Sequence, residues 1–264
     1  MDSSSFALTR GSVPLLLSFP HAGTDMPAGI EARMTPEALL RADTDWHLPL
    51  LYDFAAAMGA STLVPRFSRY VIDLNRPPED SNLYPGQDTT GLVPTDTFRK
   101  QPLYRPGQAP DEAEVAERRA RWWTPYHGAL RDELERLHAQ HGRAVLWDAH
   151  SIASVLPRFF EGKLPDLNLG TDEGRACAPA VQAAVEAVLR GQDGYTQVSN
   201  GRFKGGYITR HYGEPARGVH ALQMEMCHCT YMDESSPFGF RPDLALRVRP
   251  VLQRMLQAAL QASA

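Results

Sequence analysis

Two histidines stand directly after short apolar segments, the places where ligand-binding groups gather at the edge of an α/β sheet. His21 follows the apolar segment 13–19. His150 follows the apolar segment 144–149, in which Asp148 is also found. Two histidines and a carboxylate are a common ligand set for catalytic zinc, with water in the fourth position. Each histidine alone is also compatible with a surface position or a hydrogen-bonded core position, but together they predict a metal site.

Glu225 is a carboxylate inside an apolar segment, between Met224 and Met226. Burying an unpaired carboxylate is unfavourable, so such a residue normally has a partner or a function. Beside a zinc-activated water it would accept a proton and pass it to the leaving amine. The alternative is a structural ion pair with an arginine.

The tripeptide Cys227-His228-Cys229 has the composition of a metal-binding cluster. Successive strand residues face opposite sides, however, so the three side chains cannot all bind one ion. We interpret the two cysteines as packing residues.

The pattern of apolar residues indicates strands that alternate with helices. Strands are predicted at 13–19, 61–65, 69–74, 144–149 and 220–228. Helices are predicted at 35–58, 111–141, 174–190 and 242–262, the first beginning with Thr35-Pro36 and ending near Gly59, the second kinked or split at Pro125. Such alternation predicts an α/β fold with a largely parallel sheet covered on both faces. The ends of parallel strands meet at one edge, so residues distant in sequence would meet there.

Residues 75–110 contain seven prolines and three glycines. This segment is too irregular for a helix or strand and too long for an ordinary connection. It starts with Asn75-Arg76, directly after a predicted strand, so we expect a functional loop at the sheet edge.

The composition of the chain indicates how many domains it has, where it is located and which partners it lacks. A chain of 264 residues with 43% apolar content can form one large core, and we expect a single catalytic domain over 1–264. Three cysteines provide no disulfide framework, and neither a signal peptide nor a long apolar segment is recognisable, so we expect a cytoplasmic protein. A net charge of −4 without a basic cluster argues against nucleic acid and membrane partners.

Six motifs occur in order between about residues 12 and 240: SFPHAGTDMP, ADTDWHLPLLY, SRYVIDLNRP, LWDAHS, GRFKGGYITRHYG and ALQMEMCHCTYMDE. Together they resemble the N-formylglutamate amidohydrolases, also called N-formylglutamate deformylases. The resemblance implies a three-layer sandwich with a mixed, largely parallel sheet of about eight strands. It also implies similarity to the zinc carboxypeptidases (phosphorylase/hydrolase-like), with one zinc ion at the strand ends.

The resemblance further implies roles for individual residues. His21 and His150 correspond to zinc ligands, and Glu225 corresponds to the general base. Asn75 and Arg76 are similar to a pair that binds a substrate carboxylate, for which the planar guanidinium group of arginine is suited.

Four more residues fall in family motifs and become candidates for substrate binding: Arg69, Arg210, Gly206 and Tyr207. A dicarboxylate substrate needs at least two cationic groups besides the metal, and the arginines supply them. Which arginine binds which carboxylate stays open, as does the oligomeric state.

The carboxylate ligand of the metal is less clearly defined. Zinc carboxypeptidases have a glutamate three residues after the first histidine, whereas this chain has Thr24 at that position. Asp45 belongs to a family motif and is favoured as the ligand. Asp25 and Asp43 are the alternatives.

The function implied by the resemblance is hydrolysis of the formamide of N-formyl-L-glutamate to formate and L-glutamate, as in histidine degradation. The cofactor would be one Zn²⁺ per chain, with another divalent transition metal as the alternative. A zinc-dependent hydrolase of another N-acyl amino acid or a short peptide is the second hypothesis. A metal-free binding protein of the same fold is the third, and the presence of His21, His150 and Glu225 argues against it.

Overall fold

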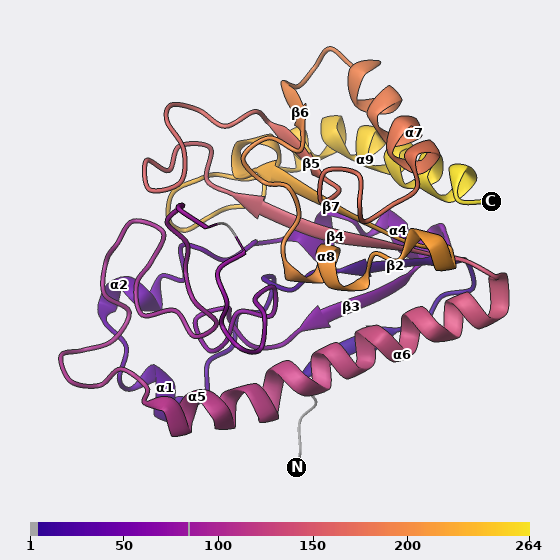
Figure 1. Cartoon of the computed structure of the whole chain (residues 1–264). Helices are drawn as coiled ribbons and strands as arrows, with labels where there is room; N and C mark the ends of the chain where they lie inside the picture. The colour runs from indigo at the N-terminus through magenta and orange to yellow at the C-terminus, as the bar shows by residue number, and fades with distance from the viewer. Residues whose placement is uncertain (1–4, 84) are drawn as a thin grey trace.

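The structure is a computed structural model that describes residues 5–83 and 85–264 (Figure 1). The strands of this described part form one seven-stranded sheet in the order β1-β3-β2-β4-β7-β5-β6. They are β1 (Phe6–Thr9), β2 (Leu15–Ser18), β3 (Ser61–Pro65), β4 (Ala144–Ile152), β5 (Leu167–Gly170), β6 (Gln197–Ser199) and β7 (Val219–Cys227).

The sheet is mixed and largely parallel, as predicted. The four central strands β3, β2, β4 and β7 run parallel to one another, and β6 runs parallel to β5. Strands β1 and β5 are antiparallel to β3 and β7, respectively. The described sheet has one strand fewer than the resemblance implies.

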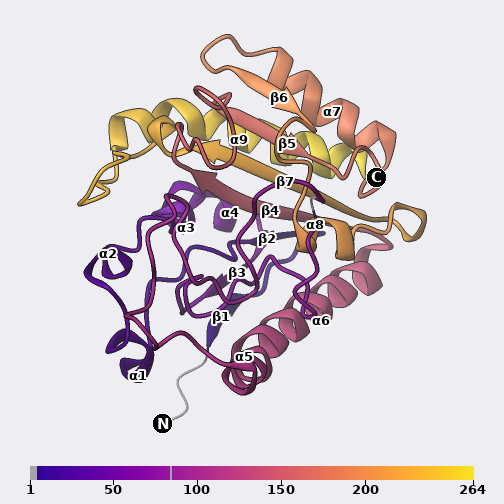
Figure 2. The ribbon, with the colours of Figure 1, turned by 60° about the vertical axis from the view of Figure 1, so that its left-hand side comes forward.

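Helices cover both faces of the sheet, which gives three layers. The helices are α1 (Ala28–Glu31), α2 (Pro36–Leu39), α3 (Leu48–Leu51), α4 (Phe54–Ala57), α5 (Glu112–Arg118), α6 (Thr124–His141), α7 (Pro179–Arg190), α8 (Tyr207–Tyr212) and α9 (Pro242–Ala262). Figures 1 and 2 show α7 and α9 side by side on one face, whereas α6 lies along the other.

The side chains of the central strands alternate between two hydrophobic clusters. Leu15 and Leu17 of β2 pack with Trp147 of β4 in the cluster that includes α7 and α9. Leu16 and Leu146 point the other way, into the cluster that includes α6. This alternation of period two fixes which strand residues can reach the edge of the sheet on each face.

The predicted strand at 69–74 is wrong, because this segment forms turns. The Val71 amide donates to the Ser68 carbonyl oxygen at 2.8 Å, and the Asp73 amide donates to Leu92 of the following loop at 2.7 Å. Its apolar side chains are buried, but these two amides find partners without a neighbouring strand.

The predicted helix at 35–58 consists of the short helices α2, α3 and α4. Its start was predicted correctly, since Thr35 Oγ1 accepts a hydrogen bond from the Ala38 amide at 3.2 Å. Arg41 and His47 have positive φ angles of 51° and 63°, which interrupt the helix. The irregular turn between them carries Asp45 to the sheet edge, where its amide donates to the His21 carbonyl oxygen at 3.1 Å.

The predicted helix at 111–141 is present as α5 and α6, joined by a π-helical turn at Arg119–Trp123. Pro125 lies in the first turn of α6 and has no amide proton to donate to the preceding turn. A π turn directly before it changes the hydrogen-bond spacing and keeps the chain helical. Helix α9 spans 242–262 as predicted, whereas α7 starts at Pro179 instead of 174.

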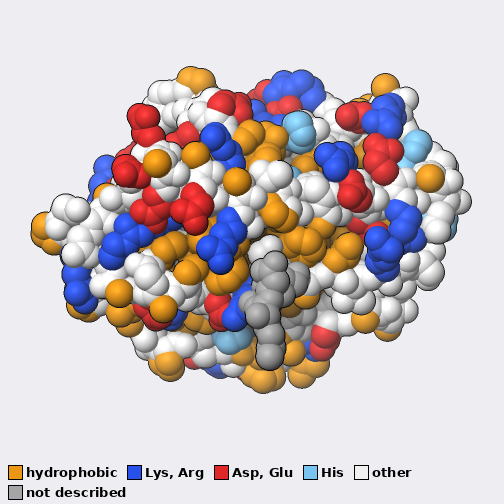
Figure 3. Space-filling model, turned by 90° about the horizontal axis from the view of Figure 1, so that it is seen from below, with side chains coloured by type: hydrophobic (Ala, Val, Ile, Leu, Met, Phe, Trp, Pro, Cys, Tyr) orange, Lys and Arg blue, Asp and Glu red, His pale blue; other side chains and the backbone are white. Residues whose placement is uncertain are grey.

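Residues 75–110 contain no helix or strand in their described part, as predicted. On the face of the molecule in Figure 3, Lys and Arg side chains are interspersed with Asp and Glu, so this face has no large patch of one charge. Every helix of residues 5–83 and 85–264 is too short or too polar to span a bilayer.

Candidate active site

Three neighbouring parallel strands bring the predicted catalytic residues together. His21 lies three residues beyond the end of β2. His150 lies within β4, because this strand continues to Ile152, beyond its predicted end. It is paired in register with Glu225 of β7, so both side chains leave the same face of the sheet.

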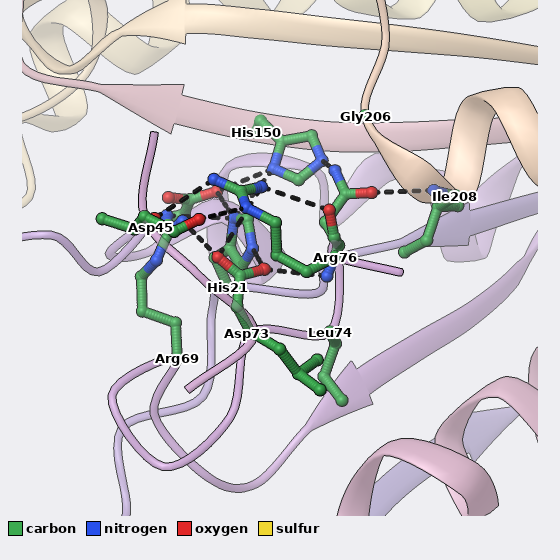
Figure 4. Close-up of polar contacts among 12 residues, drawn as sticks. His21, Asp45, Arg69, Asp73, Leu74, Arg76, His150, Gly206 and Ile208 are labelled. Atoms are coloured by element: carbon green, nitrogen blue, oxygen red, sulfur yellow. Dashed lines mark hydrogen bonds and ion pairs between the residues drawn. The ribbon is translucent and has the colours of Figure 1, made fainter. Parts of the chain in front are cut away.

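His21, Asp45 and His150 converge on one point (Figure 4). The Nδ1 atoms of the two histidines are 3.1 Å apart, and Asp45 Oδ2 lies 3.6 Å from His21 Nδ1 and 3.3 Å from His150 Nδ1. Donor atoms about 2.0–2.1 Å from a tetrahedral zinc ion are roughly 3.3 Å apart. The spacing of the three donors therefore fits a metal ion at their centre.

Polar groups around this cluster orient its ligands. The Nε2 atom of His21 is 2.7 Å from Asp73 Oδ1, and Nε2 of His150 is 2.9 Å from Asp148 Oδ2. Carboxylates behind imidazole rings are the usual second layer of a metal site, where they fix the tautomer and the ring orientation. Asp45 Oδ1 is buried and has no hydrogen-bond partner in the described part of the chain, which also fits a carboxylate that serves as a metal ligand.

The two alternative carboxylate ligands are directed elsewhere. Asp25 is paired with Arg66 at 2.6 Å on the surface. The Asp43 carboxylate accepts a hydrogen bond from the Phe98 amide at 2.8 Å. Asp45 is therefore the carboxylate that the geometry favours.

The electrostatics of the cluster match a cation site. Burial opposes ionisation of Asp45, but hydrogen bonds from His150 and His21 hold the pKa of its carboxyl well below its usual range. Burial also opposes the charging of His150, but Asp148 and Asp45 raise the pKa of this imidazole well above its usual range. The surrounding carboxylates thus favour a positive charge at this position.

Glu225 has a different environment. Its side chain lines the pocket, and burial raises the pKa of its carboxyl to about 8. The structural alternative, an ion pair with an arginine, is absent from the contacts of the described residues. A buried carboxylate with a raised pKa beside a cluster of metal-type ligands is a candidate general base.

The cluster lines a pocket that holds about 580 Å³ of space not filled by atoms, open solvent at its mouth included. Its walls include Arg69, Arg76, Phe98, Phe159, Arg202, Phe203, Gly206 and Gln223. Most of these residues lie on the long connections rather than on strands.

Two of the predicted arginines line this pocket but have different surroundings. Arg69 donates to Asp73 Oδ2 at 2.7 Å and to His21 Nδ1 at 3.1 Å, and is almost fully buried. Arg76 donates to the Thr90 carbonyl oxygen at 2.8 Å and hydroxyl at 3.1 Å, and its nearest carboxylate is Asp73 at 3.8 Å. Arg69 thus orients Asp73, whereas Arg76 makes only a longer ion pair with this carboxylate and lines the pocket.

Asn75 and Gly206 also line the pocket, and they fit against each other. Asn75 Nδ2 donates to Asp148 Oδ2 at 3.2 Å, and its Oδ1 accepts from the Ile208 amide at 2.8 Å. A Cβ atom at Gly206 would lie 2.4 Å from Asn75 Nδ2, so only glycine permits this approach. The Asn75 amide thus links the first turn of α8 to Asp148 and to His150 of the metal-type cluster.

Arg210 and Tyr207 lie outside the pocket lining. Arg210 donates to the Gly205 carbonyl oxygen at 2.8 Å and pairs with Asp172 at 3.2 Å. The Tyr207 ring stacks on His211 with 4.8 Å between centroids.

The arginine that sequence reasoning missed is Arg202. It lines the pocket, and its Nε donates to the Phe159 carbonyl oxygen at 2.7 Å. Its guanidinium also lies over the rings of Phe159 and Phe203, at 5.8 and 5.2 Å from their centroids. The sequence motif GRFKGGYITRHYG contains both Arg202 and Arg210, so its family resemblance offered Arg202 as a substrate-binding candidate as well.

The fold and the site define an α/β protein of hydrolase type, with candidate metal ligands beside a candidate general base. The model of the N-formylglutamate amidohydrolase family matches residues 13–232, and the chain belongs to this family. It is 53% identical over 251 residues to the N-formylglutamate deformylase of Pseudomonas aeruginosa, a match that covers 95% of this chain and 94% of the relative. It is 50% identical, with the same coverage, to the N-formylglutamate deformylase of Pseudomonas putida.

Solved structures support the same assignment. The N-formylglutamate amidohydrolase from Ralstonia eutropha JMP134 has a TM-score of 0.80 and 27% identity, covering 98% of this chain and 96% of that one. A gene product of Agrobacterium tumefaciens, with a TM-score of 0.75, 19% identity and the same coverage, shows the fold alone. The similarity to zinc carboxypeptidases stays a prediction.

Proposed function

We propose that this protein hydrolyses N-formyl-L-glutamate to formate and L-glutamate with a metal ion held by His21, Asp45 and His150. The main support is the convergence of these donors beside Glu225 in a chain about half identical to two N-formylglutamate deformylases. Imidazole and carboxylate donors at tetrahedral spacing favour one Zn²⁺, and another divalent transition metal is the alternative.

The residues of this chain account for the proton transfers. A bound zinc ion supplies a Lewis acid for a carbonyl oxygen and for a water molecule. Next to such an ion, Glu225 would be ionised, the form that can accept a proton. Glu225 takes a proton from the attacking water, whose oxygen bonds to the formyl carbon. The C–N bond breaks, and Glu225 returns the proton to the departing amine nitrogen.

The two carboxylates of the substrate need cationic partners in the pocket wall. Arg69 is engaged with Asp73, and Arg210 lies outside the pocket lining. Arg76 and Arg202 are the pocket-lining arginines that we assign to the substrate carboxylates. The planar guanidinium of each can bind a carboxylate through two hydrogen bonds.

The experiment that tests this function measures the acid released by the purified protein, which is formate from the formyl substrates and acetate from the acetyl substrate. N-formylglutamate, N-formylglutamine and N-acetylglutamate are compared, since the second removes only the side-chain charge and the third changes only the acyl group. N-formylglutamine should react at least about tenfold more slowly, because it leaves one arginine of the pocket without its carboxylate partner. Equal rates on the two formyl substrates would support a general N-acyl hydrolase. No formate from N-formylglutamate, in protein loaded with zinc, would contradict the proposal.

The finer biological assignments rest on the same function. We propose a single catalytic domain over 1–264, supported by the one sheet that includes every described strand. A cytoplasmic location and a role in histidine degradation stay predictions. Metal analysis of the purified protein distinguishes the enzyme from a metal-free binding protein of the same fold.

A further inference from the structure

A second group of metal-type donors lies outside the pocket lining. The carboxylate of Asp166 and the sulfur atoms of Cys227 and Cys229 lie within 4.8 Å of one another. Cys227 is the last residue of β7, and Cys229 follows in a short 3₁₀ turn. Asp166 directly precedes β5, the antiparallel neighbour of β7.

The backbone holds these donors together. The Cys227 amide donates to the Asp166 carbonyl oxygen at 2.9 Å, which continues the pairing of β5 with β7. The Cys229 amide donates to Glu234 Oε1 at 3.2 Å. His228, between the cysteines, belongs to a different environment, where its Nε2 is buried. The 3₁₀ turn after β7 thus keeps the histidine out of the group but brings the Cys229 thiol close to that of Cys227.

We propose that Asp166, Cys227 and Cys229 bind a second, thiolate-preferring divalent ion such as Zn²⁺, distinct from the one at the histidine cluster. Atoms 2.3 Å from a tetrahedral ion are roughly 3.8 Å apart, so the donors need to move together by about 1 Å at most. Two thiolates and one carboxylate are a suitable set, and water completes the tetrahedron.

The surroundings of the group allow an ion to enter and be held. Cys227 is buried, whereas Asp166 and Cys229 are partly exposed and open a route from solvent. The Thr196 hydroxyl and amide both donate to Asp166 Oδ2, at 2.8 and 3.0 Å, which fixes the carboxylate. Its Oδ1 contacts only the exposed Lys163 among the described residues, at 2.9 Å, and this flexible cation can be displaced.

The position of Asp166, Cys227 and Cys229 in the fold suggests a structural role for the ion. Residues 153–166 connect β4 to β5 and carry Phe159, which lines the pocket and contacts Arg202. An ion bound by Asp166 and the end of β7 would link this segment to the strand that carries Glu225. The second site would therefore be structural, supporting the pocket wall without touching substrate.

Cobalt spectroscopy tests the site directly. Fully reduced full-length protein, with all three thiols titratable, is loaded with Co²⁺. A near-ultraviolet thiolate-to-cobalt absorption band is expected, because only the proposed site offers sulfur ligands. The band should disappear in Cys229→Ser and persist in the control Cys177→Ser, whose thiol is buried in the main core. A folded wild-type protein without this band would overturn the proposal, as would its loss in Cys177→Ser.

Metal counting and affinity keep the proposal testable if one variant folds poorly. Zinc-loaded wild type should contain two ions per chain, whereas Cys229→Ser and His150→Ala should each retain one. Asp166→Asn should weaken Co²⁺ binding at the thiolate site by at least about tenfold, since it removes a charged ligand. Unchanged zinc content in Cys229→Ser would overturn the proposal, as would unchanged cobalt affinity in Asp166→Asn.

Discussion

The floor and the walls of the pocket are built in different ways. The floor consists of His21, His150 and Glu225, which are held in or just beyond three adjacent strands of the sheet. The walls carry Arg76 and Arg202 on irregular connections, where side chains are fixed by hydrogen bonds to carbonyl oxygens. Strands position a reaction centre accurately, whereas loops can vary the substrate that reaches it.

This division makes different predictions for the two regions. Changes in the floor should remove metal or reduce kcat, while changes in the walls should mainly affect kcat/KM and the choice of substrate. A wall variant that lost metal, or a floor variant that altered only selectivity, would break the distinction.

The largest effect is expected for His150→Ala. Loss of one of three protein ligands should release the metal from the pocket and remove several kcal/mol of transition-state stabilisation, a rate loss of about 10³-fold or more. Zinc content and formate release are measured on the same samples. His138→Ala, at the far end of α6, is the control and should keep both. Full activity in a His150→Ala protein without metal at this site would refute the assignment.

Glu225→Gln should separate chemistry from metal binding. Glutamine keeps the shape of the side chain but cannot accept a proton, so kcat should fall by about 10²-fold or more. Metal content should stay at the wild-type level, because Glu225 is outside the ligand cluster. A kcat near that of wild type would show that Glu225 is not the general base and has a structural role.

Arg202→Lys tests whether this wall arginine binds a substrate carboxylate, and Arg210, nearby in sequence, provides the matched comparison. The charge is kept, but the two-pronged hydrogen bond to a carboxylate is lost. A charged hydrogen bond contributes about 1.5–3 kcal/mol, so kcat/KM for N-formylglutamate should fall roughly ten- to a hundredfold. Arg76→Lys should have an effect of similar size.

Arg210→Lys is the control for both wall variants, because this arginine lies outside the pocket lining. Little change is expected in its kcat/KM. A large loss in Arg210→Lys together with normal kinetics in Arg202→Lys would restore the assignment made from sequence.

The smallest effect concerns the anchoring of the wall loops. Glu114 of α5 pairs with Arg33 and Arg118, and Arg118 donates to the Tyr104 hydroxyl at 2.8 Å in the long loop. The hydrogen bond from Arg33 lowers the pKa of Glu114 from 4.5 to about 2. Because this pKa is lower in the folded state, its stabilisation is present above pH 4.5 and is lost as pH falls towards 2.

Glu114→Gln should therefore reduce the free energy of unfolding at neutral pH by about 1 kcal/mol. The difference from wild type should shrink on acidification, as measured by urea unfolding at several pH values. Glu117→Gln, whose pair with Arg121 is exposed on the same helix, is the control and should change little. A difference that grew at low pH would show that the pair is not the cause.

The sequence alone determined the class of fold and most of the candidate site. Short apolar segments that end in polar residues predicted strands whose polar ends share one edge, so His21, His150 and Glu225 could be proposed from local patterns. The resemblance added Asp45, for which spacing in the sequence gave no decision among three aspartates.

Only the tertiary structure decided how the other charged residues are used. The buried apolar segment 69–74 forms turns, and its Asp73 amide donates to Leu92 of the following loop, a contact that no local pattern encodes. Arg202 and Arg210 are equivalent in charge and close in sequence, yet one lines the pocket and the other pairs with Asp172. Periodicity specifies which face of a strand is buried, whereas the direction of a loop side chain depends on partners supplied by the folded chain.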